Sequence, residues 1–188
     1  MISTTEAAQA LRDVEQTQTR TRQHQGYRGA SPFLILWGLI WALGYAGCGL
    51  FPPDRWGQIW IPLDVVGMVA SIVIGTKAAR ARNSASQPAG QLQQIITQMV
   101  AVTLFVLATI FIFQPSPIEP VLLFPSLVVG FLYVSYGGWL MPRLAWVGGA
   151  IFLLSIVGFL FLKPWLAFWL AGVGGGGLIL GGLWMREA

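Results

Sequence analysis

The sequence predicts an all-α integral membrane protein: a six-helix transmembrane bundle of three helical hairpins, preceded by a short cytoplasmic amphipathic helix. Six apolar stretches of about 20 residues, the length that crosses the hydrocarbon core of a bilayer, occupy most of the 188-residue chain. They are apolar all round, whereas helices at a protein–water surface carry a polar face. Hydrophobic residues make up 55% of the chain and charged residues only 10%, too little polar surface to cover six such helices in a soluble fold.

The polar region at residues 1–30 is expected to form a separate cytoplasmic helix. Residues 3–6, Ser-Thr-Thr-Glu, fit a capping box, in which a hydroxyl caps the helix and a carboxylate reaches back to it. Ala7, Leu11 and Val14 then form a short apolar stripe. Such a helix either docks on the membrane surface or the bundle, or binds a cytoplasmic protein partner. The protein as a whole is also a candidate for homo-oligomer formation.

The turn-forming sequence at 26–32, Gly-Tyr-Arg-Gly-Ala-Ser-Pro, is expected to break this helix and start the first span, since Pro is accepted in a first helical turn. That span begins too late and runs too long for a cleavable signal peptide. Short, proline-bearing connections make sequential helices antiparallel neighbours within a transmembrane domain of residues 31–188. The spans are expected at about 32–51, 57–76, 95–114, 121–140, 144–162 and 165–185.

The positions of Lys and Arg predict the orientation. Only Arg55 and Lys163 lie in the connections on one side, and the other nine basic residues lie on the opposite side. The side rich in Lys and Arg stays in the cytoplasm, so both termini are expected there, as an even number of spans requires. A basic fringe facing anionic lipid explains the net charge of +4 without any nucleic acid. Residues expected to touch lipid headgroups are Arg20, Arg22, Arg28, Lys77, Arg80 and Arg82.

Asp64 is the one charged residue inside a predicted span, about 10 Å below the outer end of the second helix at 1.5 Å per residue. An ionisable group at such a depth is costly and is a functional-site candidate. It is either a neutral hydrogen-bond donor that holds helices together or a proton- or cation-binding group. Four polar side chains on other spans come out at a similar depth and are expected to form a polar layer with it: Tyr45, Thr109, Ser126 and Ser155.

Small residues four apart predict close helix packing, because they let two backbones approach in a membrane. The run of four glycines at 174–177 either packs closely on two sides or forms a hinge or locally unwound segment. Pro-x-x-Val-Val-Gly occurs at both 62–67 and 125–130, through either duplication or chance. The packing residues expected from spacing are Gly67, Ser71 and Gly75 on the second span, and Gly172, Gly176, Gly177 and Gly181 on the sixth.

The residue types present argue against an enzyme. The single histidine, His24, lies outside the spans, so paired-histidine haem, His/Cys metal clusters and a Ser–His pair within the membrane are excluded. The single cysteine, Cys48, has no companion ligands and is expected to be a packing residue. No cofactor or metal is therefore expected.

The stretch Tyr-Arg-Gly-Ala-Ser-Pro-Phe-Leu-Ile-Leu-Trp-Gly-Leu-Ile-Trp at 27–41, after a Gln/Thr/Arg-rich helix, resembles small bacterial membrane proteins. The resemblance implies a bacterial cytoplasmic membrane and no activity. Three functions follow from the sequence. The first is a non-enzymatic protein that scaffolds, senses or regulates through its N-terminal helix. The second is a small transporter or channel that uses Asp64, and the third is an enzyme acting on a lipid.

Overall fold

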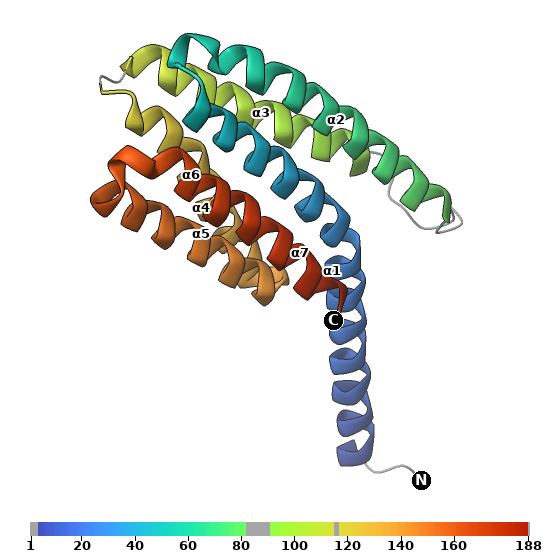
Figure 1. The fold of residues 1–188 in the computed structure, drawn as a ribbon. Coiled ribbons are helices and arrows are strands. Elements are labelled where there is room, and N and C mark those ends of the chain that lie inside the picture. The colour runs from blue at the N-terminus through green and yellow to red at the C-terminus, as the bar shows by residue number, and fades with distance from the viewer. Residues whose placement is uncertain (1–3, 82–90, 115–116, 188) are drawn as a thin grey trace.

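The computed structural model describes residues 4–81, 91–114 and 117–187, and in these residues it contains helices and no β-strand. The predicted all-α class with six apolar helical segments is confirmed. Figure 1 shows the segments side by side in one bundle, with the N-terminal part of the first helix extending beyond it. The helices are α1 (Thr4–Leu50), α2 (Trp56–Ala81), α3 (Gln91–Phe113), α4 (Glu119–Leu140), α5 (Pro142–Phe161), α6 (Leu166–Leu170) and α7 (Gly177–Arg186).

Five segments are long and apolar enough to cross a membrane. The last of them is a single rod in which α6 and α7 are joined by a π-helical segment, η3 (Ala171–Gly176). In α3 the apolar stretch is shorter and runs over Val100–Phe113. The observed helices agree with the predicted spans to within a few residues at most ends, because the length of an apolar run determines both.

The turn predicted at 26–32 is wrong. Helix α1 continues through it as one helix of 47 residues, which at 1.5 Å per residue is about 70 Å long. The turn residues are overridden by packing: Tyr27 and Ser31 are buried, and the Ser31 hydroxyl donates a hydrogen bond to the Gly182 carbonyl at 2.7 Å. Pro32 removes only one backbone hydrogen bond from a helix that these contacts hold in place.

Helix α1 lies at the centre of the bundle and packs against both α2 and the η3–α7 rod. Its contact with the rod depends on glycine. A Cβ added at Gly175 would lie 2.6 Å from the Ala42 backbone nitrogen, and one at Gly38 would lie 2.8 Å from the Gly175 carbonyl oxygen. The two backbones can approach this closely only because neither residue carries a side chain.

Helices α4 and α5 form the tightest pair, a hairpin joined only by Met141. Gly130 and Gly148 face each other, so that a Cβ on Gly148 would come within 2.7 Å of the Gly130 carbonyl oxygen. The buried apolar core lies between this hairpin, α1 and the η3–α7 rod, and Trp41, Ile151 and Leu170 belong to it.

The Met141 end of the bundle is the end where α4 turns into α5. A Cβ on Gly26 of α1 would lie 3.0 Å from the Met141 sulfur, so the N-terminal extension of α1 leaves the bundle at this end. The chain also finishes there after α7, and Figure 1 shows the C-terminus beside α1. Both ends of the chain therefore lie on the same side of the bundle.

Candidate functional site

Tyr45 and Ser126 meet in the core of the bundle. Tyr45 is 1% exposed and Ser126 is fully buried. The Tyr45 hydroxyl donates to the Leu122 carbonyl at 3.0 Å and also lies 3.0 Å from the Ser126 hydroxyl oxygen. A phenol has one hydrogen to donate, so Ser126 donates in the second contact. The rings of Trp41 and Trp60 meet the Tyr45 ring edge-on, with centroids 5.6 and 5.2 Å away, and fix its orientation.

Ser155 is a third buried hydroxyl at this depth. In the α4–α5 hairpin Gly130 faces Phe152. One turn further along the two antiparallel helices, Ser126 and Ser155 therefore come level. Ser155 is fully buried, and its hydroxyl oxygen has no hydrogen-bond partner in the described part of the chain. An unpaired hydroxyl in such a place costs free energy.

The predicted polar layer is only partly assembled. Thr109 donates to the Phe105 carbonyl of its own helix at 2.8 Å and joins none of the other layer residues. Asp64 is half-buried on α2 and forms no hydrogen bond or ion pair with any described residue. Depth along a span follows from counting residues, but the direction in which a side chain points depends on how each helix is rotated. That rotation cannot be read from the spacing of residues along one span.

The small residues of α2 lie at its contact with α1. A Cβ on Gly67 would lie 2.5 Å from the Ile40 side chain, and Ser71 accepts a hydrogen bond from the Trp37 indole at 3.2 Å. Gly75 follows one turn later on the same face. Near the connection between α1 and α2, Cys48 is buried and accepts a hydrogen bond from the Trp60 indole.

The small residues of the last rod divide into two groups. Gly177 and Gly181 face Ile151 and Val147 of α5. By contrast, a Cβ added at Gly172 or Gly176 would meet no atom within 4 Å, so these two glycines make no close helix contact within the described bundle. The glycines that pack against α1 are instead Gly174, Gly175 and Gly182. Each π-helical turn adds a residue to the normal turn, so the face that meets α1 shifts relative to the four-residue spacing.

Arg143 forms a junction that the sequence analysis did not identify. Its guanidinium donates to the Trp184 carbonyl at 2.8 Å, and it lies 5.0 Å from the Trp184 ring centroid and 5.5 Å from that of Tyr27. The Tyr27 hydroxyl accepts a weak hydrogen bond from the Arg143 backbone at 3.4 Å. One arginine thus connects α1, α5 and α7 at the Met141 end. The only signals in the sequence were Tyr27 at the predicted start of the first span and Trp184 near the end of the last.

Five of the six basic residues predicted to contact lipid headgroups lie in described helices. Arg28, Lys77 and Arg80 are exposed. Arg20 and Arg22 belong to the projecting part of α1, and Arg82 lies outside the described residues.

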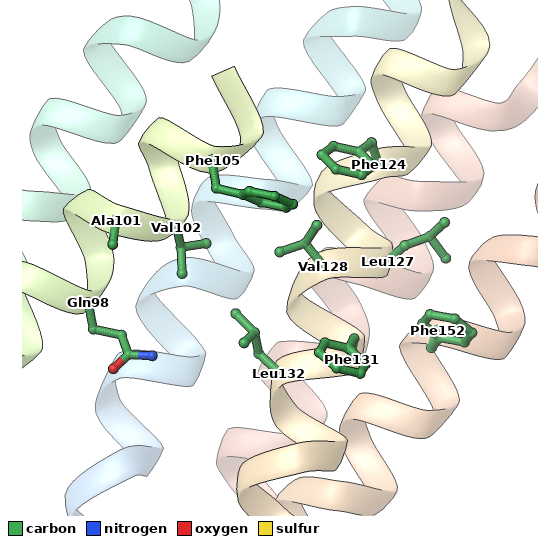
Figure 2. A pocket seen from close by; sticks show the side chains of 10 residues that line it. All are labelled: Gln98, Ala101, Val102, Phe105, Phe124, Leu127, Val128, Phe131, Leu132 and Phe152. Carbon is green, nitrogen blue, oxygen red and sulfur yellow. The ribbon is translucent and has the colours of Figure 1, made fainter. Parts of the chain in front are cut away.

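A lateral crevice of about 530 Å³ separates α3 from α4, and Figure 2 shows the side chains that line it. Gln98 is the one polar residue of the lining, and its side-chain amide donates to the Tyr136 hydroxyl. Such a surface has no acid, base or nucleophile and suits an apolar chain. The lining residues are Gln98, Ala101, Val102, Phe105, Phe124, Leu127, Val128, Phe131, Leu132 and Phe152.

In the described part of the chain, no group of three His, Cys, Asp or Glu residues is placed to hold a metal ion. Comparisons with protein-family models, with curated proteins and with solved structures found no match to this chain. The Tyr45–Ser126 pair, Asp64 and the junction at Arg143 are therefore interpreted from their own geometry.

Proposed function

We propose that this chain is a non-enzymatic, multi-pass protein of the bacterial cytoplasmic membrane that presents the N-terminal part of α1 to a cytoplasmic protein partner. The observation that carries the proposal is the unbroken course of α1 from Thr4 to Leu50. A projecting helix that is continuous with a membrane span keeps a fixed direction relative to the bundle, whereas one attached through a flexible turn does not. The part of α1 that projects from the bundle, residues 4–25, is called the arm below, and it is suited to scaffolding or signalling.

Membrane insertion is supported by the surface of the bundle. Large apolar side chains are exposed on every long helix, among them Leu43, Val66, Phe111, Phe131 and Leu160. Contiguous apolar surface of this extent is not stable in water, whereas lipid is a suitable solvent for it. Hairpins of alternating direction, which place both termini at the Met141 end, fit this arrangement, and the excess of Lys and Arg favours the cytoplasm for that end.

The root of the arm is held by several contacts. Tyr27 packs among Leu34, Leu144 and Met185, and the Arg143 guanidinium lies over its ring. Cation–π contacts of this kind contribute about 0.5–1 kcal/mol at exposed sites. Because the same arginine bonds the carbonyl of Trp184, a force on the arm reaches α5 and α7 as well as α1.

Topology is tested by fusing a reporter that is active only in the cytoplasm at three positions. Fusion at the C-terminus is expected to give signal, and fusion after Pro53 or after Ser116 is expected to give none. Signal at either of these two connections would contradict the orientation, and with it the cytoplasmic position of the arm.

The arm is tested by placing a photo-crosslinking amino acid at Gln9, which is exposed on α1. We expect a discrete adduct with one cytoplasmic protein in living cells, and none from the same amino acid at Asp54, which lies at the opposite end of the bundle. A five-residue Gly/Ser insertion after Gln23 is expected to abolish the adduct, because it uncouples the arm from the bundle. An adduct that survives the insertion would contradict a rigid arm, and lipid adducts alone would contradict a protein partner.

A transporter is the second candidate, and Asp64 is the observation that favours it. A half-buried carboxyl group without a described partner, in the stretch 59–76 of α2 that carries no other charge, is typical of proton and cation pathways. Reconstituted protein is then expected to move protons or a monovalent cation across a vesicle membrane, and Asp64→Asn is expected to abolish the flux. Equal flux from both forms, or none from the wild type, would leave the scaffolding role.

A further inference from the structure

We propose that a trough on α1 at the Met141 end binds one anionic phospholipid. The trough consists of Arg28, Ser31, Pro32, Ile35, Leu36 and Leu39 of α1 together with Arg186 at the end of α7, and its volume is about 650 Å³. The proposal rests on the membrane insertion proposed above. It assigns a specific headgroup site, which a general basic fringe does not require.

The trough has one charged end and one apolar end. Arg28 and Arg186 come from different helices and are both exposed, and neither forms an ion pair with a described residue. Glu187 follows Arg186 in the chain but pairs with neither arginine. Two guanidiniums on one rim, neither of them paired with a described carboxylate, favour a phosphate group, which accepts several of their hydrogen bonds at once.

The floor of the trough offers no competing polar group. The Ser31 hydroxyl, the only polar side chain of the lining besides the arginines, is already bonded to the Gly182 carbonyl at 2.7 Å. Ile35 packs onto Gly182, so that a Cβ on this glycine would lie 2.7 Å from the Ile35 side chain. The α1–α7 contact therefore closes the back of the trough and leaves Leu36 and Leu39 to line its apolar end.

The dimensions fit one leaflet. Arg28 and Leu39 are eleven residues apart on one helix, which is about 16 Å along its axis at 1.5 Å per residue. Half of a hydrocarbon core about 30 Å thick is about 15 Å. A lipid whose phosphate lies between the arginines would thus lay an acyl chain along Ile35, Leu36 and Leu39. Basic pockets between helices on the cytoplasmic side of a membrane are suited to anionic headgroups.

The test measures lipid retention by the full chain, purified in detergent and then mixed with phosphatidylglycerol or phosphatidylcholine. Native mass spectrometry is expected to show one retained phosphatidylglycerol and little phosphatidylcholine. The variant Arg28→Gln/Arg186→Gln is expected to weaken phosphatidylglycerol retention about thirtyfold, from the contribution typical of two basic residues at a lipid surface. Arg55→Gln, an exposed arginine at the opposite end, is the matched control and is expected to retain the lipid like the wild type.

The apolar half is tested by filling it. Leu39→Trp is expected to lower retention, whereas Leu180→Trp, at an exposed leucine of α7 outside the trough, is expected to have no effect. Equal retention of both lipids by the wild type, or unchanged retention by the double arginine variant, would overturn the proposal. Competition by inorganic phosphate at millimolar concentration, with no effect of Leu39→Trp, would show that the arginines bind free phosphate instead of a lipid.

A separate measurement distinguishes failure of this site from failure of the proposed function. Membranes from cells that make the wild-type chain are washed with sodium carbonate. If the chain is extracted, it is not an integral membrane protein and both proposals fail. If it stays in the membrane but retains no phosphatidylglycerol, only the lipid site fails.

Discussion

The last rod and α2 are both apolar segments of similar length, yet they are held very differently. In the apolar window of Lys163–Arg186, 44% of the residues are buried inside the bundle, against 11% in that of Pro53–Ala78. The rod meets α1 through glycines that would clash if they carried a Cβ. Helix α2 meets α1 mainly through large side chains, and Trp60, Ile59 and Trp37 fill the space over the glycines opposite.

In the membrane setting proposed above, the difference indicates what would hold the helices together. Apolar area gives no preference for a neighbouring helix over lipid, because the two are equally apolar. Close approach of backbones does give a preference, through dispersion and hydrogen bonding at short range. The rod and the α4–α5 hairpin have small residues where they meet their neighbours. Helix α3 has few such residues and leaves a crevice beside α4.

The largest expected effect comes from breaking the tight contact at Gly175. A methyl group there would lie 2.6 Å from the Ala42 backbone, which cannot move aside as a side chain can. Gly175→Ala is expected to destabilise the bundle by about 1–3 kcal/mol, the usual cost of overpacking. Gly176→Ala is the matched control, since it adds its methyl group to open space, and it is expected to be neutral or slightly stabilising. Both free energies of unfolding are measured by SDS titration of detergent-solubilised protein. Equal effects would contradict a contact that depends on Gly175.

Asp64 lies on α2, the less buried of the two segments, and it provides a second test. Since the carboxyl group has no described partner, Asp64→Leu is expected to stabilise the protein, in contrast to the hydrogen-bonded role that the sequence also allowed. The gain is expected to be about 1 kcal/mol, below the 2.5 kcal/mol or more of a charge at the centre of a membrane. Asp54→Leu, at an exposed aspartate in the short 3-10 turn before α2 (Pro53–Arg55), serves as the control and is expected to change little. Destabilisation by Asp64→Leu would reveal a partner for this carboxyl group.

The fold was largely predictable because its main determinant is local. The apolar run at 144–162 and the observed α5 at Pro142–Phe161 differ by two residues or fewer at each end. The turn at 26–32 was not predictable, because glycine and proline signals are local, whereas the burial of Tyr27 and Ser31 against α5 and α7 is tertiary. Long-range contacts override local preferences in such cases.

The candidate site was predictable in depth but not in direction. Counting residues along the spans placed Tyr45, Ser126 and Ser155 at one level, and the structure brings the first two into contact. The same count included Thr109, which bonds its own helix instead. The sequence placed Arg143 on the same side as the two termini, but it did not predict the contacts of Arg143 with Tyr27 and Trp184. Residues so far apart in sequence meet only through the packing of α1, α5 and α7.

The hydrogen-bonded pair of Tyr45 and Ser126 in the core gives a third test, with an expected effect of similar size. Tyr45→Phe removes the donor to the Leu122 carbonyl and leaves Ser126 without its partner. The loss is expected to be about 1 kcal/mol, within the range measured for hydrogen bonds between membrane helices. A double-mutant cycle with Ser126→Ala isolates the pair, and the two losses should not add. Thr109→Val is the control and should cost less, since its hydroxyl joins no second helix. Additive losses for Tyr45 and Ser126 would show that their hydroxyls do not interact.

The smallest expected effect distinguishes the two buried serines of the α4–α5 hairpin. Ser126 and Ser155 are both fully buried and lie at one level, but only Ser126 has a hydrogen-bond partner in the described part of the chain. Replacing a paired hydroxyl removes a favourable hydrogen bond. Replacing an unpaired hydroxyl removes no such bond and relieves the cost of burying an unsatisfied polar group. Ser155→Ala is therefore expected to change the free energy of unfolding by less than about 0.5 kcal/mol or to raise it slightly, while Ser126→Ala lowers it. The two variants have the same change in volume, so their difference reports hydrogen bonding and not packing. A loss at Ser155 as large as that at Ser126 would show that the Ser155 hydroxyl is satisfied in the membrane, with an ordered water molecule as the simplest partner for a polar group so deeply enclosed.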